Sequence, residues 1–343
     1  MVDRSHRSHP PAHAQRGAAH RPRPTRDVLP APFHDARTAP ADPRNGRCGV
    51  KLATYNIQYG IGRDGIYDLA RAVGTVAEAD VIAFQEVERG FARTFHDDQP
   101  ALIEALLPDR YVVYAPLFDR DASERRTDGR VRNARRQFGV LTASRSPIIS
   151  ARLEVLPKHD GGPLFNLATG FLETIIATPA GALRLLNIHL GHLSEPERLD
   201  QIVALRQRLA AAAGDGGPWS GSDRDAHDWE FPEPAPTPIA TILTGDFNTG
   251  PGEAAYAALT TLVAPEGDAL VDAWDAASPG TPAVTYYTNP AQGAFEDSRI
   301  DHIFLPSRLT PGLAVHIDSA ADGSDHQPVF ATIPALDEAA YRR

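Results

Sequence analysis

Residues 238–251, with the sequence P-I-A-T-I-L-T-G-D-F-N-T-G-P, constrain the fold of this chain more than any other stretch. Residues 239–243 form a short, apolar and partly β-branched run, which predicts a buried strand. Gly245 ends this run, and Asp246 and Asn248 follow where the strand gives way to a loop. Because alternate side chains of an extended segment share a face, this carboxylate and this amide would project to one side. Such a pair can hold an attacking water and a phosphoryl oxygen, or it can simply form an Asx turn.

Composition sets limits on the class of protein. The 343 residues are 42% hydrophobic, which is enough for one large core or two modest ones. The net charge of −10 is uneven, because residues 1–49 carry +5 and residues 50–343 carry −15. An acidic body argues mildly against tight binding of long duplex DNA, although a bound divalent cation inverts the local field. Cys48 is the only cysteine, which excludes an intramolecular disulfide and a cysteine-based zinc site.

The ends of the chain differ in composition from its centre. Residues 1–49 contain eight Pro, five His and nine Arg and few large apolar residues, so we expect residues 1–48 to be a disordered basic tail. We expect one catalytic domain over residues 49–335 and a short C-terminal tail over 336–343. No apolar run approaches the ~18–20 residues of a membrane span, and no secretory leader is evident. We therefore expect a monomeric, cytoplasmic protein without a transmembrane segment.

Other predicted strands also place polar residues at or near their ends. An acid within an apolar strand is costly unless it is paired or ligated, whereas a lone strand histidine is more often a hydrogen-bonded core residue. A strand-end acid can also be plain surface. The residues concerned are Asn56 in strand 50–57, Gln85 and Glu86 after strand 81–84, His189 in strand 183–190, Asp301 and His302 in mid-run of strand 298–306, and Asp325 and His326 ahead of strand 329–333.

Two helices have clear sequence signals. Asp68 stands close to the start of the first helix, which has Leu69, Val73 and Val76 on one face. Ser194 and Glu197 have capping-box spacing and open a second helix that runs to about residue 213. The expected inward side chains of this second helix are Leu199, Ile202, Val203 and Leu209.

Residues 119–136 are dense in charge, with seven Arg and four acidic residues. Gly129 and the absence of an apolar stripe predict a loop. Arginine is suited to bidentate phosphate contacts, so Arg125, Arg126 and Arg130 are candidates to contact a substrate phosphate. The alternative interpretation is a solvated loop that neutralises its own charge.

The strand-end residues form an inventory of oxygen ligands and histidines that suits a hard cation with room for water and a phosphate. No serine lies in a G-x-S-x-G elbow, which argues against acyl transfer. The sequence also lacks the G-x-x-x-x-G-K-[ST] and G-x-G-x-x-G loops of nucleotide-binding proteins.

Six short motifs, T-Y-N, Q-E, N-I-H-L, G-D-F-N, R-I-D-H-I and S-D-H, occur in this order. With them, nearly all of residues 50–335 resembles the endonuclease/exonuclease/phosphatase superfamily. The resemblance implies an α/β (α+β) fold of the DNase I type. Such a fold is a four-layer sandwich of two mixed, mainly antiparallel sheets packed face to face, with helices on the outer faces.

The resemblance also implies roles for individual residues. Glu86 matches the principal metal ligand, with Asn56 beside it and Asp325 as an additional acid, and the expected cofactor is Mg²⁺ or Mn²⁺. His326 matches a histidine that contacts the phosphate or activates water, with Asp301 as its partner. The sequence departs at residue 58, where Gln stands in place of the aspartate of abasic-site endonucleases.

The remaining correspondences concern the reacting groups. His189 matches a second phosphate-facing histidine, and Asp246 with Asn248 matches the pair that positions the nucleophile and the phosphate. The expected function is a metal-dependent phosphoesterase that hydrolyses a P–O bond by in-line attack of water. The expected substrate is a small molecule, a lipid headgroup or a nucleic acid. Alternatives are a nuclease acting on DNA or RNA and a non-catalytic binding module on the same scaffold.

Overall fold

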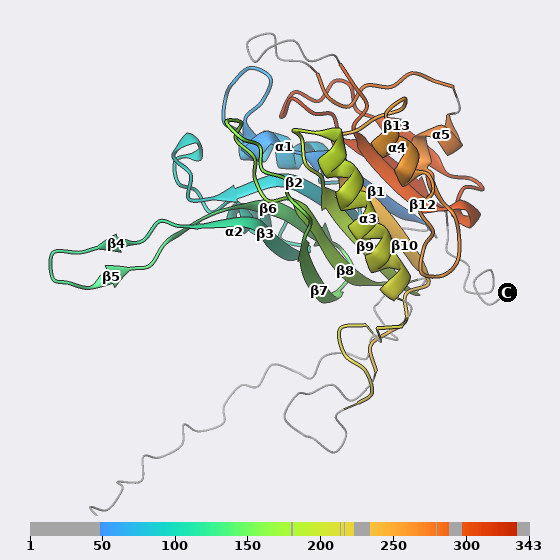
Figure 1. Ribbon diagram of the computed structural model, residues 1–343, viewed down its shortest axis with the longest axis horizontal. Helices are drawn as coiled ribbons and strands as arrows, with labels where there is room; N and C mark the ends of the chain where they lie inside the picture. The colour runs from blue at the N-terminus through green and yellow to red at the C-terminus, as the bar shows by residue number, and fades with distance from the viewer. Residues whose placement is uncertain are drawn as a thin grey trace, which may run out of the picture. The chain divides into compact units, whose positions relative to one another are not determined.

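The computed structural model describes residues 49–334, apart from 180, 213, 216, 223–233, 279 and 288–296. The predictions for tails 1–48 and 336–343 lie outside the described residues. All the described residues belong to one compact unit, Ala39–Arg343, which is built on two six-stranded sheets (Figure 1).

The first sheet has the strand order β13-β14-β1-β2-β6-β3. It is mixed, because β1 pairs in parallel with β2 and antiparallel with β14. Its strands are β1 (Val50–Asn56), β2 (Val81–Arg89), β3 (Tyr111–Asp121), β6 (Arg135–Ser144), β13 (Ala314–Ile317) and β14 (Val329–Ile333).

The second sheet has the order β11-β12-β10-β9-β8-β7 and is also mixed, since only β9 and β10 pair in parallel. Its strands are β7 (Ile148–Val155), β8 (Gly170–Thr178), β9 (Gly181–His189), β10 (Ala240–Asp246), β11 (Leu270–Asp272) and β12 (Asp301–Pro306). The predicted fold class of two mixed, mainly antiparallel sheets is therefore confirmed.

The two sheets pack face to face through apolar side chains from both, among them Leu52, Leu185 and Ile242. Buried polar side chains also link the two sheets across this interface. The Gln85 amide donates to Asn187 Oδ1 at 2.7 Å, and the Asn187 amide donates to the Leu141 carbonyl at 3.0 Å. Each sheet thus satisfies buried polar groups of the other, which fixes their relative register.

Helices cover the outer faces, as the sequence predicts. Helix α1 (Leu69–Val76) begins at Asp68, whose side chain accepts a hydrogen bond from the Arg71 amide, and it packs on the first sheet together with α2 (Gln99–Leu106). Helix α3 (Glu195–Ala212) and α4 (Ala254–Leu259) cover the second sheet (Figure 1). The short α5 (Ala273–Ala277) follows β11 directly.

Three local predictions are wrong. Residues 119–136 are not a loop but a long β-hairpin, in which β3 and β6 run past the sheet and continue into β4 (Glu124–Arg125) and β5 (Val131–Arg132) (Figure 1). Charged side chains can alternate along such a ladder because both faces meet water. Val203 of α3 is 52% exposed, and Leu205 is buried in its place. Asp301 is the first residue of β12 rather than a mid-strand residue.

No helix formed by the described residues combines the length and the apolar character needed to cross a membrane.

Candidate active site

Strand ends from both sheets meet at one edge of the sandwich and bring the predicted polar residues together. The register places Asp246 opposite both His189 and Asp301, and Asn56 opposite Gln85. Glu86 follows Gln85 on β2, and Asp325 and His326 lie just ahead of β14. Asn56 bridges the two sheets, since its side-chain amide donates to Glu86 Oε1 at 3.2 Å and to Asp246 Oδ2 at 2.9 Å.

His326 and Asp301 form a buried pair, with 2.8 Å between His326 Nδ1 and Asp301 Oδ2. The other ring nitrogen, Nε2, lies 3.9 Å from Asp246 Oδ2 and 4.0 Å from Asp325 Oδ1, beyond hydrogen-bond distance. Burial opposes protonation of His326, but the negative charges of Asp301, Asp246 and Asp325 outweigh it and raise the pKa well above its usual range. The imidazole is therefore held protonated with one N–H available to a ligand.

Asp246 lies at the centre of the cluster. Its Oδ1 accepts a hydrogen bond from the Asn248 amide at 2.9 Å, and its Oδ2 accepts the bond from Asn56. Burial and the negative charge of Asp301 raise its pKa. Gly245 precedes it because β9 passes so close that a Cβ would lie 1.9 Å from the Ile188 carbonyl oxygen. A carboxylate in this environment can accept a proton near neutral pH.

His189 and Asn248 flank Asp246. His189 Nε2 lies 3.6 Å from Asp246 Oδ2, and its buried Nδ1 has no hydrogen-bond partner among the described residues. Burial and the positive charge of His326 lower the pKa of His189 to about 3, so this ring is neutral. Asn248 has a left-handed backbone with φ 50°, and its side-chain amide donates to the Leu190 carbonyl at 2.9 Å.

Glu86 and Asp325 form the part of the cluster best suited to a divalent cation. Burial and the negative charge of Asp325 raise the pKa of Glu86 to about 7. Burial also raises the pKa of Asp325. Glu86 lies at a bulge of β2 with φ 58°, a strained conformation of the kind that collects at functional sites. A cation between these carboxylates would relieve their repulsion, and their oxygen atoms are the ligands that Mg²⁺ prefers.

A second set of ligand atoms, on Asp246, Asp301 and His326, lies within 4.8 Å of one another. Within this set, the Asp301–His326 hydrogen bond uses His326 Nδ1 and Asp301 Oδ2. It leaves His326 Nε2 and Asp301 Oδ1 without a hydrogen-bond partner among the described residues. Gln58, the departure noted in the sequence, donates from Nε2 to Asp325 Oδ2 at 2.6 Å. Gln58 thus orients the Asp325 carboxylate, whereas an aspartate at position 58 would have added a third negative charge beside Glu86 and Asp325.

Several supporting residues were not identified in the sequence. The Ser324 hydroxyl donates to the Asn56 carbonyl at 2.7 Å, and Thr285 Oγ1 accepts from the Asp301 amide at 3.0 Å. The Tyr286 ring lies 5.0 Å from the His326 ring, centroid to centroid. The S-D-H motif was a signal for Ser324, but Thr285 and Tyr286 come from a loop with no distinguishing pattern.

The structure does not bring Arg125, Arg126 and Arg130 into the cluster. These residues are exposed at the end of the β4–β5 hairpin, where the Arg126 amide donates to the Arg130 carbonyl across the turn.

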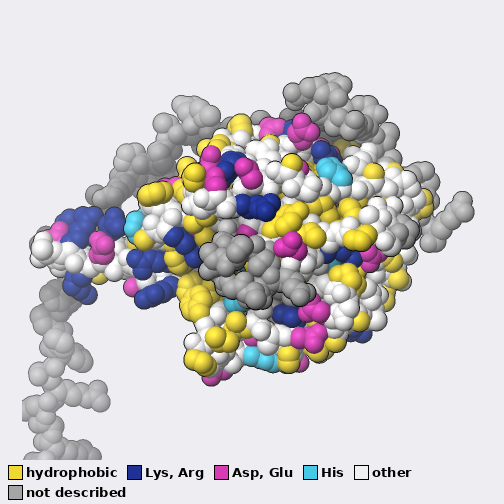
Figure 2. All heavy atoms as spheres, turned by 90° about the horizontal axis from the view of Figure 1, so that it is seen from above, with side chains coloured by type: hydrophobic (Ala, Val, Ile, Leu, Met, Phe, Trp, Pro, Cys, Tyr) yellow, Lys and Arg dark blue, Asp and Glu magenta, His cyan; other side chains and the backbone are white. Residues whose placement is uncertain are grey.

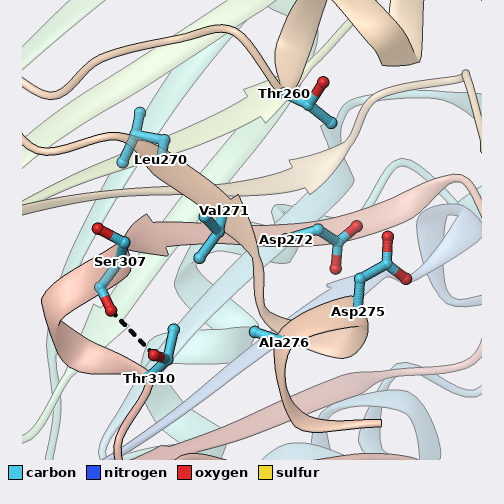
Figure 3. Close-up of a pocket in the computed structure, with 8 residues that line it drawn as sticks. All are labelled: Thr260, Leu270, Val271, Asp272, Asp275, Ala276, Ser307 and Thr310. Atoms are coloured by element: carbon cyan, nitrogen blue, oxygen red, sulfur yellow. Dashed lines mark hydrogen bonds between the residues drawn. The ribbon is translucent and has the colours of Figure 1, made fainter. Parts of the chain in front are cut away.

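A separate hollow of about 440 Å³ lies beside α5 and the turn after β12 (Figure 3). It is lined by Thr260, Leu270, Val271, Asp272, Asp275, Ala276, Ser307 and Thr310. Ser307 and Thr310 follow the Pro306 end of β12, opposite the end that carries Asp301. Asp272 and Asp275 are already paired with Arg299, so the hollow offers no free acid for catalysis.

Comparisons with known proteins agree with this geometry. The sequence profile of the Endonuclease/Exonuclease/phosphatase family matches residues 53–326. A search among curated proteins found no significant match. Similar solved structures include an endonuclease/exonuclease/phosphatase from Beutenbergia cavernae, with TM-score 0.54, 19% identity, and coverage of 84% of this chain and 72% of that one. Another is the Bacteroides vulgatus protein, with TM-score 0.54, 18% identity and coverage of 84% and 99%. A third is truncated Caenorhabditis elegans TDP2, with TM-score 0.52, 18% identity and coverage of 84% and 98%.

Proposed function

Because the chain belongs to the endonuclease/exonuclease/phosphatase family, we propose that it is a Mg²⁺- or Mn²⁺-dependent phosphoesterase that hydrolyses a P–O bond by in-line attack of water. The observation that carries this proposal is the pair His326–Asp301, which presents one free ring nitrogen beside Asp246. A protonated imidazole and a carboxylate on one small face can hold a phosphoryl oxygen and a water at the same time.

In this proposal, Glu86, Asn56 and Asp325 hold the metal. Glu86 and Asp325 are partly exposed, and the charge of Asp325 raises the pKa of Glu86, which supports that role. Asn56 is buried beside them and donates to Glu86 Oε1. When bound, the ion would neutralise charge on the phosphate and on the leaving oxygen.

The other residues of the cluster orient the attacking water and the phosphoryl oxygens. Asp246 orients the attacking water and accepts its proton, with Asn56 and the Asn248 amide holding the carboxylate in place. His326 donates from Nε2 to a phosphoryl oxygen, and Asp301 fixes its ring. His189 is neutral, and its Nε2, 3.6 Å from Asp246 Oδ2, is the ring nitrogen that can serve a second phosphoryl oxygen.

The proposal predicts hydrolysis of bis-p-nitrophenyl phosphate by the purified full-length protein, which chelator abolishes and Mg²⁺ or Mn²⁺ restores. Glu86→Gln should require much more metal for the same rate, because it removes one negative charge from the site. Gln58→Ala is the matched control, since it alters a neighbour of Asp325 without changing the charge. Equal activity of the wild type in excess chelator would exclude the metal assignment.

A nuclease is the second candidate. One observation favours it: the arginine-rich hairpin that begins beside the active-site edge.

A further inference from the structure

The hairpin formed by residues 119–136 begins next to the active-site cluster. Phe138 of β6 lies against the His189 ring, with 6.2 Å between ring centroids, and Arg89 at the end of β2 pairs with Gln137. Gly90, with φ 80°, lets β2 end close to β6, because a Cβ there would lie 2.7 Å from the Arg135 carbonyl oxygen. The hairpin therefore extends from the edge that carries Glu86 and His189.

The hairpin is positively charged, unlike the rest of residues 50–343. Its seven arginines and four acids give a net charge of +3 in a chain of net charge −10. Weak surface pairs bind some of the arginines, such as Arg130 with Asp128 at 3.9 Å and Arg132 with Glu124 at 3.8 Å. Within the described part of the chain, Arg120 and Arg126 have no carboxylate in ion-pair range. Figure 2 shows Lys and Arg side chains concentrated along the protrusion.

The length of the hairpin decides which ligand can use it. Arg130 precedes Phe138 by eight residues on the arm of the hairpin that leads into β6, so extended backbone places the two about 25 Å apart. A small phosphate ester held at His326 cannot reach that far. A nucleic-acid strand, at about 3.4 Å per nucleotide, spans the distance with roughly seven or eight nucleotides.

The composition of the hairpin favours a phosphodiester polymer over a lipid surface. Residues 119–136 contain no aromatic side chain, and Val131 is their only large aliphatic residue. Membrane insertion requires apolar or aromatic side chains at the tip. Arginines on a polar ladder instead suit phosphate oxygens, which they contact in a bidentate manner.

We propose that the 119–136 hairpin is a binding arm for the distal phosphates of a nucleic-acid strand whose scissile phosphate lies at His326. This inference rests on the proposed phosphoesterase function for the position of the scissile phosphate. The arm supplies affinity along the backbone, which compensates for the acidic body, and it does not take part in the chemical step.

The test measures binding by fluorescence anisotropy of labelled 4-nucleotide and 20-nucleotide thymidine oligomers, in excess chelator so that no turnover occurs. Replacing Arg125, Arg126 and Arg130 with Gln should weaken binding of the 20-mer roughly tenfold at low salt and leave the 4-mer unchanged. The slope of log K against log salt should flatten by about two, because each lost phosphate contact contributes about 0.7 for single strands.

The control variant carries Lys51→Gln, Arg145→Gln and Arg206→Gln, which remove the same charge. Lys51 and Arg145 lie at the far strand ends of the first sheet and Arg206 on α3. Equal weakening by both triple variants, or a loss that is independent of oligomer length, would overturn the proposal. So would binding to phosphatidylserine vesicles in place of the 20-mer.

Hydrolysis of bis-p-nitrophenyl phosphate separates this inference from the function it rests on. The hairpin variant should retain the wild-type kcat and KM for this small diester. If the wild type hydrolyses the diester but does not bind the 20-mer, the nucleic-acid-binding role of the hairpin is wrong and the proposed phosphoesterase function is retained. If the 20-mer binds through the hairpin but no metal-dependent hydrolysis occurs, the proposed function is wrong.

Discussion

Asp301 and His302 are consecutive residues of β12, and each belongs to a buried Asp–His pair. Asp301 pairs with His326, and His302 pairs with Asp272, both with 2.8 Å between Nδ1 and Oδ2. Because consecutive strand residues point to opposite faces, one pair lies in the candidate active-site cluster and the other in the core behind it.

The two pairs differ in what their remaining atoms contact. Asp272 also accepts hydrogen bonds from Arg299 at 2.7 Å and from the Tyr256 hydroxyl at 3.0 Å, and His302 Nε2 lies 2.9 Å from the Thr249 carbonyl oxygen. In contrast, Asp301 Oδ1 is buried without a partner among the described residues. His326 Nε2 donates no hydrogen bond to a described residue, since Asp246 Oδ2 is 3.9 Å away.

An Asp–His pair is therefore no sign of catalysis by itself. Both nitrogens of His302 face acceptors, so this ring serves to hold Thr249, which directly follows Asn248 in the loop after β10. The pair at Asp301 keeps one buried atom, Asp301 Oδ1, without a partner among the described residues, which is costly unless a ligand uses it. The comparison predicts that one pair governs rate and the other governs stability.

The largest expected effect is on rate at the Asp301–His326 pair. His326→Gln retains an amide that can donate to Asp301 but loses the charged, proton-transferring ring. We expect kcat for bis-p-nitrophenyl phosphate to fall by about 10²–10⁴-fold, with a nearly unchanged midpoint of urea unfolding.

The control for this prediction combines His326→Gln with Asp301→Asn. Groups that act as one unit lose activity non-additively, so the double variant should be hardly slower than His326→Gln alone. Multiplicative losses would show that Asp301 has a separate task, such as binding the metal.

The next largest effect is on stability at the Asp272–His302 pair. Asp272→Asn leaves His302 buried without a carboxylate and Arg299 with only Asp275. Breaking a buried ionic network of this kind costs about 3–5 kcal/mol of unfolding free energy. Urea denaturation measures that loss, while kcat of the folded variant should stay within a few-fold of wild type. A variant that is fully stable but inactive would reverse the two assignments.

The sequence predicts the residues of the candidate active site because each lies at or near the end of an apolar strand, and the ends of packed strands converge. Glu86, Asp246 and Asp301 were placed together for this reason, and the register of β9, β10 and β12 agrees. The helix start at Asp68 was equally predictable, since capping is a local interaction.

Features that depend on distant contacts could not be predicted. The hairpin in residues 119–136 lacks the apolar alternation that marks a strand, and its pairing follows from the β3–β6 ladder that it extends. The role of His302 depends on Asp272 and Thr249, which lie 30 and 53 residues away in sequence. Its neighbour Asp301 looks equivalent in the sequence, so only the three-dimensional partners separate the two.

The smallest predicted effect is the pH dependence of the stability that the Asp272–His302 pair contributes. Burial raises the pKa of Asp272, but the hydrogen bond and charge of His302 and the charge of Arg299 outweigh burial and lower the pKa from 3.8 to about 2. A lowered pKa contributes stability above its unfolded value, and this contribution is lost as the pH falls through the folded value. The shift corresponds to roughly 2 kcal/mol. Urea unfolding of wild type and Asp272→Asn should therefore differ by about that much less near pH 2 than at pH 5. A difference that stays constant over this range would mean that the charge of Asp272 does not stabilise the core pair.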